Sequence, residues 1–349
     1  MLKIVTPADE LYRPRFPGYD IELSACRGVE IQIVEIPASA TEDEFIEAAQ
    51  TADGLYAKVM SRPITRRIIE QLKQCRVISA PSVGVEMIDL AAATERGIPV
   101  TNVPDVYTDE VADHTMALLL ACARRLSYCD DKVRAGNWSD VRPYLSEVPR
   151  LYGQTLGLVG FGRIARAVAR RALPFGLRIV AHDPYIDQSL MTASGIEPVS
   201  LQRLLEVADI ISVHTPSTKS AMKLIGAAEF SKIKRGALFI NTGRAHAVDE
   251  RALLEALDDG RIAFAGLDVF DHEPLGLGSP FMALKNVILT PHVAPVSSRF
   301  EEERRRRVGT ELSLVLDGRW PLSCVNPSVL NRSALERWQA VSFDRGPRA

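Results

Sequence analysis

Short apolar runs and longer amphipathic stretches alternate along the first 104 residues. Short apolar runs are typical of buried parallel strands, and stretches whose apolar positions recur every three or four residues are typical of helices. The expected strands cover 3–6, 31–36, 54–58, 77–79 and 100–102, with helices such as 42–51 and 65–74 between them. This alternation predicts a small α/β domain.

A second series of expected strands begins at residue 156. Its strands cover 156–159, 178–182, 209–214, 237–241, 264–269 and 286–290, and helices are expected at 201–206 and 249–259. Asp249 is the expected N-cap of the latter helix, and Gly260 its stop. A long helix over 298–317 then returns the chain toward the first domain.

The chain has 349 residues, which is longer than a single hydrophobic core usually accommodates, so two domains are expected. We predict an α/β fold in which a doubly wound parallel sheet, 105–293, is inserted into a smaller domain. That smaller domain would consist of 1–104 and the return segment 294–330. Residues 331–349 would form a loose tail, with Trp338 and Phe343 as its candidate anchors.

A glycine motif follows the first strand of the second series. Gly160, Gly162 and Ala165 have the spacing G-x-G-x-x-G/A. The first glycine permits a tight turn, the second lets backbone approach a pyrophosphate, and the small third residue lets the helix pack close to the strand. The next strand ends on Asp183, where a carboxylate would meet a ribose 2′-hydroxyl.

Such a glycine turn also occurs in other α/β proteins, but the ordered strand, turn, helix, strand and acid predict an NAD(H) site. Asp183 would repel the 2′-phosphate of NADP(H), and no arginine stands in the next few positions. The sequence therefore favours NAD(H) over NADP(H).

Residues 109–126, DEVADHTMALLLACARRL, predict a helix that is apolar on most sides. Such a helix must be buried between domains or subunits. His114, within it, is expected to be a core or interface histidine.

Composition and charge exclude several classes of partner. The formal net charge of −2 gives no electrostatic reason to expect nucleic acid or an anionic membrane as partner. The longest strongly apolar run, 116–123, is too short to span a bilayer, and the first residues lack the layout of a signal peptide. The block EEERRRR at 301–307 is interpreted as a solvated helix face whose charges pair at i,i+4, and not as a nucleic-acid patch.

The five cysteines are scattered without a C-x-x-C pair. This pattern predicts reduced thiols in the cytoplasm, without a disulfide framework or a metal site.

Polar residues gather at the ends of the expected strands of the second domain. Ligands bind beyond the carboxyl ends of the strands in an open parallel sheet. These ends carry Gly160, Asp183, His214, the segment 241–244, the segment 268–273 and His292. One edge of the sheet is therefore the expected site.

Three of these residues form a coherent acid–base set. His292 is a proton donor or acceptor near neutral pH, and Glu273 could accept a hydrogen bond from one of its ring nitrogens. Arg244 offers a bidentate fork for a carboxylate or a polarised carbonyl. Hydride transfer between a nicotinamide and a 2-oxo acid needs these roles. Singly, each residue also has a purely structural interpretation: a strand-end histidine, a solvated loop acid and a surface cation.

The ordered segments GLVGFGRIA, HDPY, VHTPST, INTGRAHAVDE, GLDVFDHEP and ILTPH resemble the D-isomer-specific 2-hydroxyacid dehydrogenase family. The resemblance covers about residues 50–327 and is greatest to the branch of C-terminal-binding proteins and phosphoglycerate-dehydrogenase-like enzymes. It implies two Rossmann-like domains, with the dinucleotide-binding one inserted in a flavodoxin-like substrate domain. It also implies a homodimer formed through the helix at 109–126.

The resemblance implies that Arg244 binds substrate, that Glu273 and His292 form the acid–base dyad, and that Asp268 and Thr108 touch the nicotinamide end. Backbone N–H groups at Val83 and Gly84 are expected to bind the substrate carboxylate, beside Arg244 and His292. The expected cofactor-binding residues, from the glycine turn, the strand ends and the resemblance together, are Thr108, Gly160, Phe161, Gly162, Arg163, Ile164, Asp183, His214, Thr215, Pro216, Thr242, Arg244, Asp268 and His292.

Three departures from the family pattern bear on specificity rather than catalysis. Ala80, Ser82 and Glu86 replace a basic residue, a glycine and an aspartate in the carboxylate loop. Ala245–His246 follows the substrate arginine in place of glycine, and Ala294–Pro295 follows His292.

The expected function is hydride transfer between NAD(H) and a small D-2-hydroxy acid or 2-oxo acid. The alternative is an NAD(H)-sensing, corepressor-like binding protein with vestigial activity. The complete set of Arg244, Glu273 and His292 favours the enzyme, because a scaffold has no physical need of all three.

Overall fold

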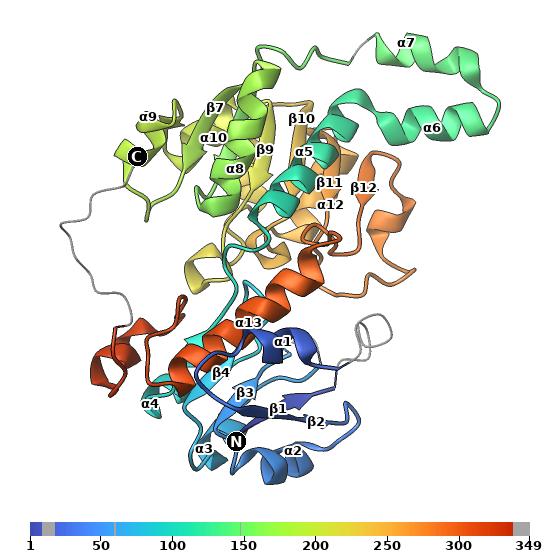
Figure 1. Ribbon diagram of the computed structural model, residues 1–349. Coiled ribbons are helices and arrows are strands. Elements are labelled where there is room, and N and C mark those ends of the chain that lie inside the picture. The colour runs from blue at the N-terminus through green and yellow to red at the C-terminus, as the bar shows by residue number, and fades with distance from the viewer. Residues whose placement is uncertain (9–17, 59–60, 147, 338–349) are drawn as a thin grey trace. The chain divides into compact units, whose positions relative to one another are not determined.

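The structure is a computed structural model that describes residues 1–8, 18–58, 61–146 and 148–337. The chain divides into two compact units (Figure 1), the first formed by 1–106 and 298–349 and the second by 107–297. The predicted domain bounds at 104/105 and 293/294 stay a prediction. The α/β fold class with two parallel sheets is confirmed.

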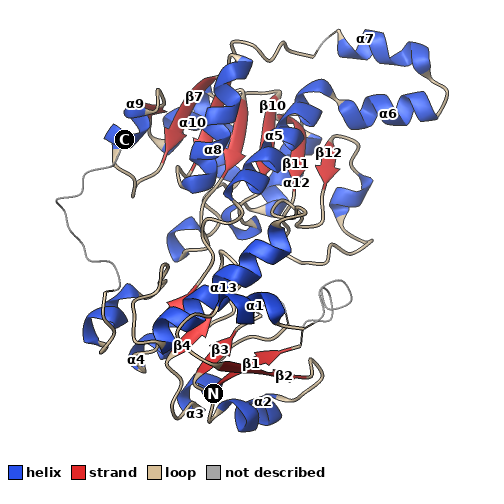
Figure 2. Ribbon diagram, viewed as in Figure 1, coloured by secondary structure: helices blue, strands red, loops and turns tan. Residues whose placement is uncertain are grey.

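Within the described residues, five parallel strands form the sheet of the first unit, in the order β2-β1-β3-β4-β5 (Figure 2). The strands are β1 (Leu2–Pro7), β2 (Ile31–Ile36), β3 (Gly54–Tyr56), β4 (Val77–Ser79) and β5 (Val100–Thr101). The helices are α1 (Asp20–Ala25), α2 (Glu42–Ala49), α3 (Arg66–Gln71), α4 (Leu90–Glu95) and α13 (Phe300–Leu316). Side chains of α2, α3 and α4 share one apolar cluster with Val5, Leu55 and Ile78 of the strands.

The second unit contains a seven-stranded parallel sheet among its described residues, in the order β12-β11-β10-β9-β6-β7-β8. Its strands are β6 (Thr155–Val159), β7 (Arg178–His182), β8 (Glu197–Pro198), β9 (Ile210–Val213), β10 (Ala237–Asn241), β11 (Ile262–Leu267) and β12 (Val287–Leu289). Strand order reverses between β6 and β9, and ligands bind at such a switch point. A ligand is therefore expected beside the glycine turn that follows β6.

Helices cover both faces of this second sheet, except for α6 (Leu126–Arg134) and α7 (Val141–Leu145), which bury no residue. The others are α5 (Thr108–Arg124), α8 (Arg163–Ala172), α9 (Gln188–Ala193), α10 (Leu201–Val207), α11 (Ala227–Lys232) and α12 (Glu250–Asp258). In β10, Leu238 and Ile240 join the apolar cluster of α5 and α8, whereas Phe239 joins the cluster of α10, α11 and α12. Alternate residues of a central strand are thus buried on opposite faces.

The helix predicted at 109–126 is α5, and it ends earlier than expected. Arg125 takes a left-handed backbone with a φ of 55°, and α6 starts immediately after it. The buried side of α5, which includes Ala112 and Leu119, packs inside its own unit against α8, β10 and β11. The apolar character of this helix thus follows from burial within the second unit.

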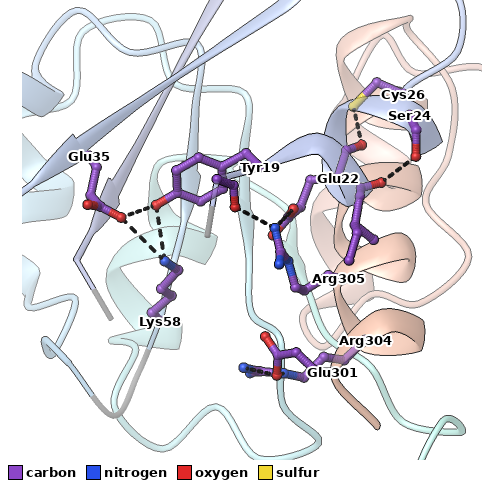
Figure 3. Close-up of polar contacts among 11 residues, drawn as sticks. Tyr19, Glu22, Ser24, Cys26, Glu35, Lys58, Glu301, Arg304 and Arg305 are labelled. Carbon is purple, nitrogen blue, oxygen red and sulfur yellow. Dashed lines mark hydrogen bonds and ion pairs between the residues drawn. The ribbon is translucent and has the colours of Figure 1, made fainter. Parts of the chain in front are cut away.

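The interpretation of residues 301–307 as a solvated, self-paired face is wrong for three of its seven charges, which are buried. Glu302 pairs with Arg306 at i,i+4 and both are exposed, as expected. Arg305, however, is buried and pairs with Glu22 of α1, while the buried Arg304 pairs with Glu301 (Figure 3). The reason is that α13 packs against α1 in the first unit, which covers this side of the helix.

The beginning of the predicted tail is packed against the first unit. The Trp320 N–H donates to the Glu336 carbonyl, and the Arg337 guanidinium lies over the Trp320 ring at 4.4 Å. Trp338 and Phe343 lie outside the described residues. Among those that are described, no helix is long and apolar enough to cross a membrane.

Candidate active site

The glycine turn has the geometry that its sequence requires. Gly160 adopts a φ of 89°, and a Cβ there would lie 2.9 Å from the His214 carbonyl oxygen. Only glycine fits this close approach without strain. A Cβ on Gly162, in contrast, would meet nothing within 4 Å, so the space beside the start of α8 is open to a ligand.

Asp183 lies beside this turn at the end of β7. One of its carboxylate oxygens accepts the Phe161 N–H at 2.8 Å, and the other accepts the Tyr185 N–H at 2.9 Å. These bonds fix the carboxylate next to the turn and leave lone pairs for two hydroxyls. The Phe161 side chain is fully buried, whereas the Ile164 side chain packs partly buried against the same cluster.

The start of α8 and the end of β9 supply further groups for a dinucleotide. No side chain caps α8, which begins at Arg163, so its first N–H groups and positive dipole end are available to an anion. The buried Thr215 hydroxyl has no hydrogen-bond partner within the described part of the chain. The residues present therefore fit an NAD(H) group.

His214, also at the end of β9, stays neutral near pH 7. Burial lowers the pKa of its imidazole to about 4. Its Nε2 lies 2.9 Å from the Ser212 hydroxyl. Pro216, two residues further on, is exposed.

His292 and Glu273 are brought together by the loops that follow β12 and β11. The imidazole Nδ1 lies 2.7 Å from the Glu273 Oε2. This hydrogen bond raises the pKa of His292 above its ordinary value, against the effect of burial. Burial by itself would raise the pKa of Glu273, but the hydrogen bonds from His292 and from the Phe270 N–H lower it overall.

The backbone of His292 is left-handed, with a φ of 53°. For a residue other than glycine this conformation costs on the order of 1–3 kcal/mol, and it persists where the surroundings determine it. The fully buried Asp268 fixes this backbone through hydrogen bonds. Its carboxylate accepts the N–H groups of Val293 at 3.0 Å and Ala294 at 2.9 Å, while its carbonyl accepts the His292 N–H.

Arg244 follows β10, and its charge acts on the same pair. Its positive charge lowers the pKa of Glu273 and counteracts the rise in the pKa of His292. The Asn241 side chain holds the loop by donating to the Arg244 carbonyl, and the Arg244 Nη1 donates to the Gly243 carbonyl at 2.9 Å. Beside it, the buried Thr242 hydroxyl lies 2.7 Å from the Thr115 hydroxyl of α5.

Val83 and Gly84 belong to the first unit, in the loop after β4. The Val83 carbonyl accepts the Asn102 side-chain N–H, and the Gly84 carbonyl accepts the Ser82 hydroxyl. Within the described residues, the N–H groups of Val83 and Gly84 donate no hydrogen bond. Ala80, where the family pattern has a basic residue, is fully buried.

The second unit thus brings together Arg244, Asp268, Glu273 and His292. Sequence reasoning did not place His114 or Thr290 near this group, although the His114 Nε2 lies 3.0 Å from the Thr290 hydroxyl. The only sequence signal was that Thr290 ends an expected strand two residues before His292. The described residues hold no cluster of three or more His, Cys, Asp or Glu side chains that could bind a metal ion.

Comparisons with known proteins show which proteins this chain is similar to. Residues 116–294 match the sequence profile described as "D-isomer specific 2-hydroxyacid dehydrogenase, NAD binding domain". A glyoxylate reductase of Korarchaeum cryptofilum is 38% identical over 302 residues, which are 86% of this chain and 91% of that protein. A D-3-phosphoglycerate dehydrogenase of Methanocaldococcus jannaschii is 37% identical over 298 residues, which are 85% of this chain but 56% of that protein.

A solved structure shows the same fold. It is the D-lactate dehydrogenase from Aquifex aeolicus in complex with NAD and lactic acid, which is 26% identical with a TM-score of 0.77. The match covers 95% of this chain and 98% of that one.

Proposed function

Because the chain belongs to the D-isomer specific 2-hydroxyacid dehydrogenase family, it is an NAD-dependent oxidoreductase, and we propose that Arg244, Glu273 and His292 carry its chemistry. The substrate is a small 2-oxo acid, reduced to the D-2-hydroxy acid, or the same pair in reverse. The observation that carries this proposal is the 2.7 Å hydrogen bond between His292 and Glu273.

His292 is the proton donor during reduction. When bound, NADH would supply the hydride to the 2-carbon. The forming alkoxide needs a proton, and the imidazolium of His292 is the group with a suitable pKa. Glu273 stabilises the charged ring and fixes the tautomer in which Nε2 faces the substrate. In the reverse direction the neutral ring accepts the proton.

Arg244 holds the substrate. Its guanidinium can bind a carboxylate or polarise a carbonyl through two N–H groups. The N–H groups of Val83 and Gly84 bind the substrate carboxylate in this proposal. Their lack of hydrogen-bond acceptors within the described residues supports that role.

The cofactor-binding residues are those of the glycine turn and the strand ends. The α8 N-terminus with Gly160 and Gly162 would hold the pyrophosphate, and Asp183 a ribose. The remaining candidates complete this set: Thr108, Phe161, Arg163, Ile164, His214, Thr215, Pro216, Thr242 and Asp268.

A homodimer through residues 109–126 and a cytoplasmic location are also proposed. Support for the dimer comes from the segment that follows α5: no residue of α6 or α7 is buried, and both extend away from the second sheet (Figure 1). Leu126 and Trp138 in this segment are exposed. Support for the cytoplasm comes from the cysteines, since all five are free thiols.

Turnover of a panel of 2-oxo acids, followed by NADH absorbance, tests the function. Glyoxylate, 3-phosphohydroxypyruvate and pyruvate represent the substrates suggested by the relatives' names. We expect reduction of at least one of them. Tight binding of NADH without turnover of any 2-oxo acid would refute the enzyme and favour a dinucleotide sensor.

A further inference from the structure

His114 contacts the loop that carries His292, although the chemistry proposed above does not use it. It lies on α5 with 23% of its side chain exposed. Its Nε2 is 3.0 Å from the Thr290 Oγ1 and 3.6 Å from the Asp268 Oδ1. The Thr290 Oγ1 in turn lies 2.6 Å from the same Asp268 oxygen. The three side chains therefore form a chain that ends on a buried carboxylate.

The direction of these hydrogen bonds follows from their donors. A carboxylate only accepts, so the single hydroxyl proton of Thr290 points to Asp268. The Thr290 oxygen must then accept from His114, whose Nε2 carries a proton. His114 thus determines which way the Thr290 hydroxyl points. Among the described residues, the only other acceptor within reach of that hydroxyl is the Leu267 carbonyl, at 3.5 Å.

The carboxylate at the end of this chain controls the backbone after the proposed proton donor. Asp268 accepts the N–H groups of Val293 and Ala294, the two residues that directly follow His292. These bonds, with the bond from the His292 N–H to the Asp268 carbonyl, surround the left-handed backbone of His292. A change in the Asp268 carboxylate would therefore move the imidazole.

A second contact ties the same loop to α5. The Ser297 hydroxyl donates to the Glu110 carboxylate at 3.0 Å, one turn of α5 before His114. The loop after β12 is thus fixed to α5 at both of its ends. This arrangement makes α5 part of the support of His292.

We propose that His114 is a positioning residue for His292 and acts through Thr290 and Asp268. This proposal rests on the proposed role of His292 as the acid–base residue. His114 does not contact the substrate. Its N–H holds the Thr290 hydroxyl on Asp268, and Asp268 holds the backbone that aims the imidazole.

Matched variants of His114 test this role. His114→Leu removes the N–H but keeps the bulk, whereas His114→Gln places an N–H donor near the position of Nε2. We expect His114→Leu to lower kcat roughly tenfold or more, because misplacing a reacting group is costly even without its loss. The KM for the 2-oxo acid and the affinity for NADH should change little. His114→Gln should restore most of kcat.

Hydrogen exchange in the absence of cofactor gives a readout that is independent of activity. The amides of Val293 and Ala294 should exchange faster in His114→Leu than in the wild type, and in His114→Gln they should remain protected. Pro291 and Pro295 have no amide, so only the amides of His292, Val293 and Ala294 lie between them.

Thr290 provides the decisive second variant, including the case in which His114→Leu does not fold. Thr290→Val removes the hydroxyl at nearly constant shape and should reproduce the loss of kcat. Thr290→Ser keeps the hydroxyl and should retain most of the wild-type kcat. The double variant His114→Leu/Thr290→Val should be no worse than the worse single variant, because both act through one chain of bonds.

Near-normal kcat in Thr290→Val would overturn the proposal, as would an equal loss in His114→Gln and His114→Leu. The separate variant His292→Ala tests the function on which the proposal rests. If His292→Ala is inactive while Thr290→Val is fully active, the proposed function stands and only the role of His114 fails.

Discussion

The ion pair between Glu22 and Arg305 offers a sharp test of how the first unit is held together. Two hydrogen bonds join the carboxylate and the guanidinium, at 2.8 Å and 2.6 Å, and the side chains are 1% and 5% exposed (Figure 3). Replacing Glu22 by Gln keeps the shape but leaves the buried guanidinium facing a neutral amide. Breaking a buried pair in this way costs about 3–5 kcal/mol.

For a unit of this size, that cost corresponds to a decrease in melting temperature on the order of 10 °C. Glu302→Gln is the matched control, because Glu302 pairs with Arg306 on the same helix but is exposed. An exposed i,i+4 pair contributes about 0.3–0.5 kcal/mol, so this control should melt almost like the wild type. Thermal unfolding followed by circular dichroism measures both.

The double variant Glu22→Leu/Arg305→Met completes the test. Replacing both charged side chains by apolar ones also removes the buried cation, so the double variant should be more stable than Glu22→Gln alone. If Glu22→Gln melts within 1–2 °C of the wild type, as the exposed control should, the pair does not hold α1 on α13 and the reasoning fails.

Three further outcomes are expected at the site. Glu273 raises the pKa of His292, so reduction should proceed below that pKa and be lost as the pH rises through it. In Glu273→Gln the decrease of kcat with rising pH should occur at lower pH, and an unchanged kcat profile would exclude the coupling. Arg244→Ala should lower kcat/KM roughly a hundredfold through loss of a bidentate contact, with a rise in KM that steady-state kinetics would detect. Asp183 should make kcat/KM for NADH exceed that for NADPH, and Asp183→Ser should reduce the ratio; equal values for both cofactors in the wild type would contradict its role.

Local patterns were sufficient to predict the framework of the second unit. The strand, glycine turn, helix, strand and acid are confirmed at β6, Gly160, α8, β7 and Asp183. The N-cap at Asp249 is also confirmed, since its side chain accepts the N–H groups of Arg251 and Ala252. Each of these features depends on residues that are near one another in sequence. Their spacing along the chain is therefore enough to predict them.

The errors and omissions concern contacts between distant segments. Arg305 was expected to be solvated because its neighbours on α13 are charged, but its partner Glu22 lies at the other end of the chain. The contact of His114 with Thr290 and Asp268 depends likewise on how α5 packs on the sheet. Periodicity indicates that a helix has a buried face, but it does not identify the polar groups that the face meets.

The most direct test of the proposed chemistry is a single-turnover measurement on His292→Ala. Stopped-flow absorbance would follow the oxidation of bound NADH by the best 2-oxo acid, and fluorescence titration would check that NADH still binds. Loss of the acid–base group should lower the rate by roughly a hundredfold or more while NADH affinity is kept. A rate close to that of the wild type would show that the proton comes from another group and that the pairing of His292 with Glu273 is not the acid–base dyad.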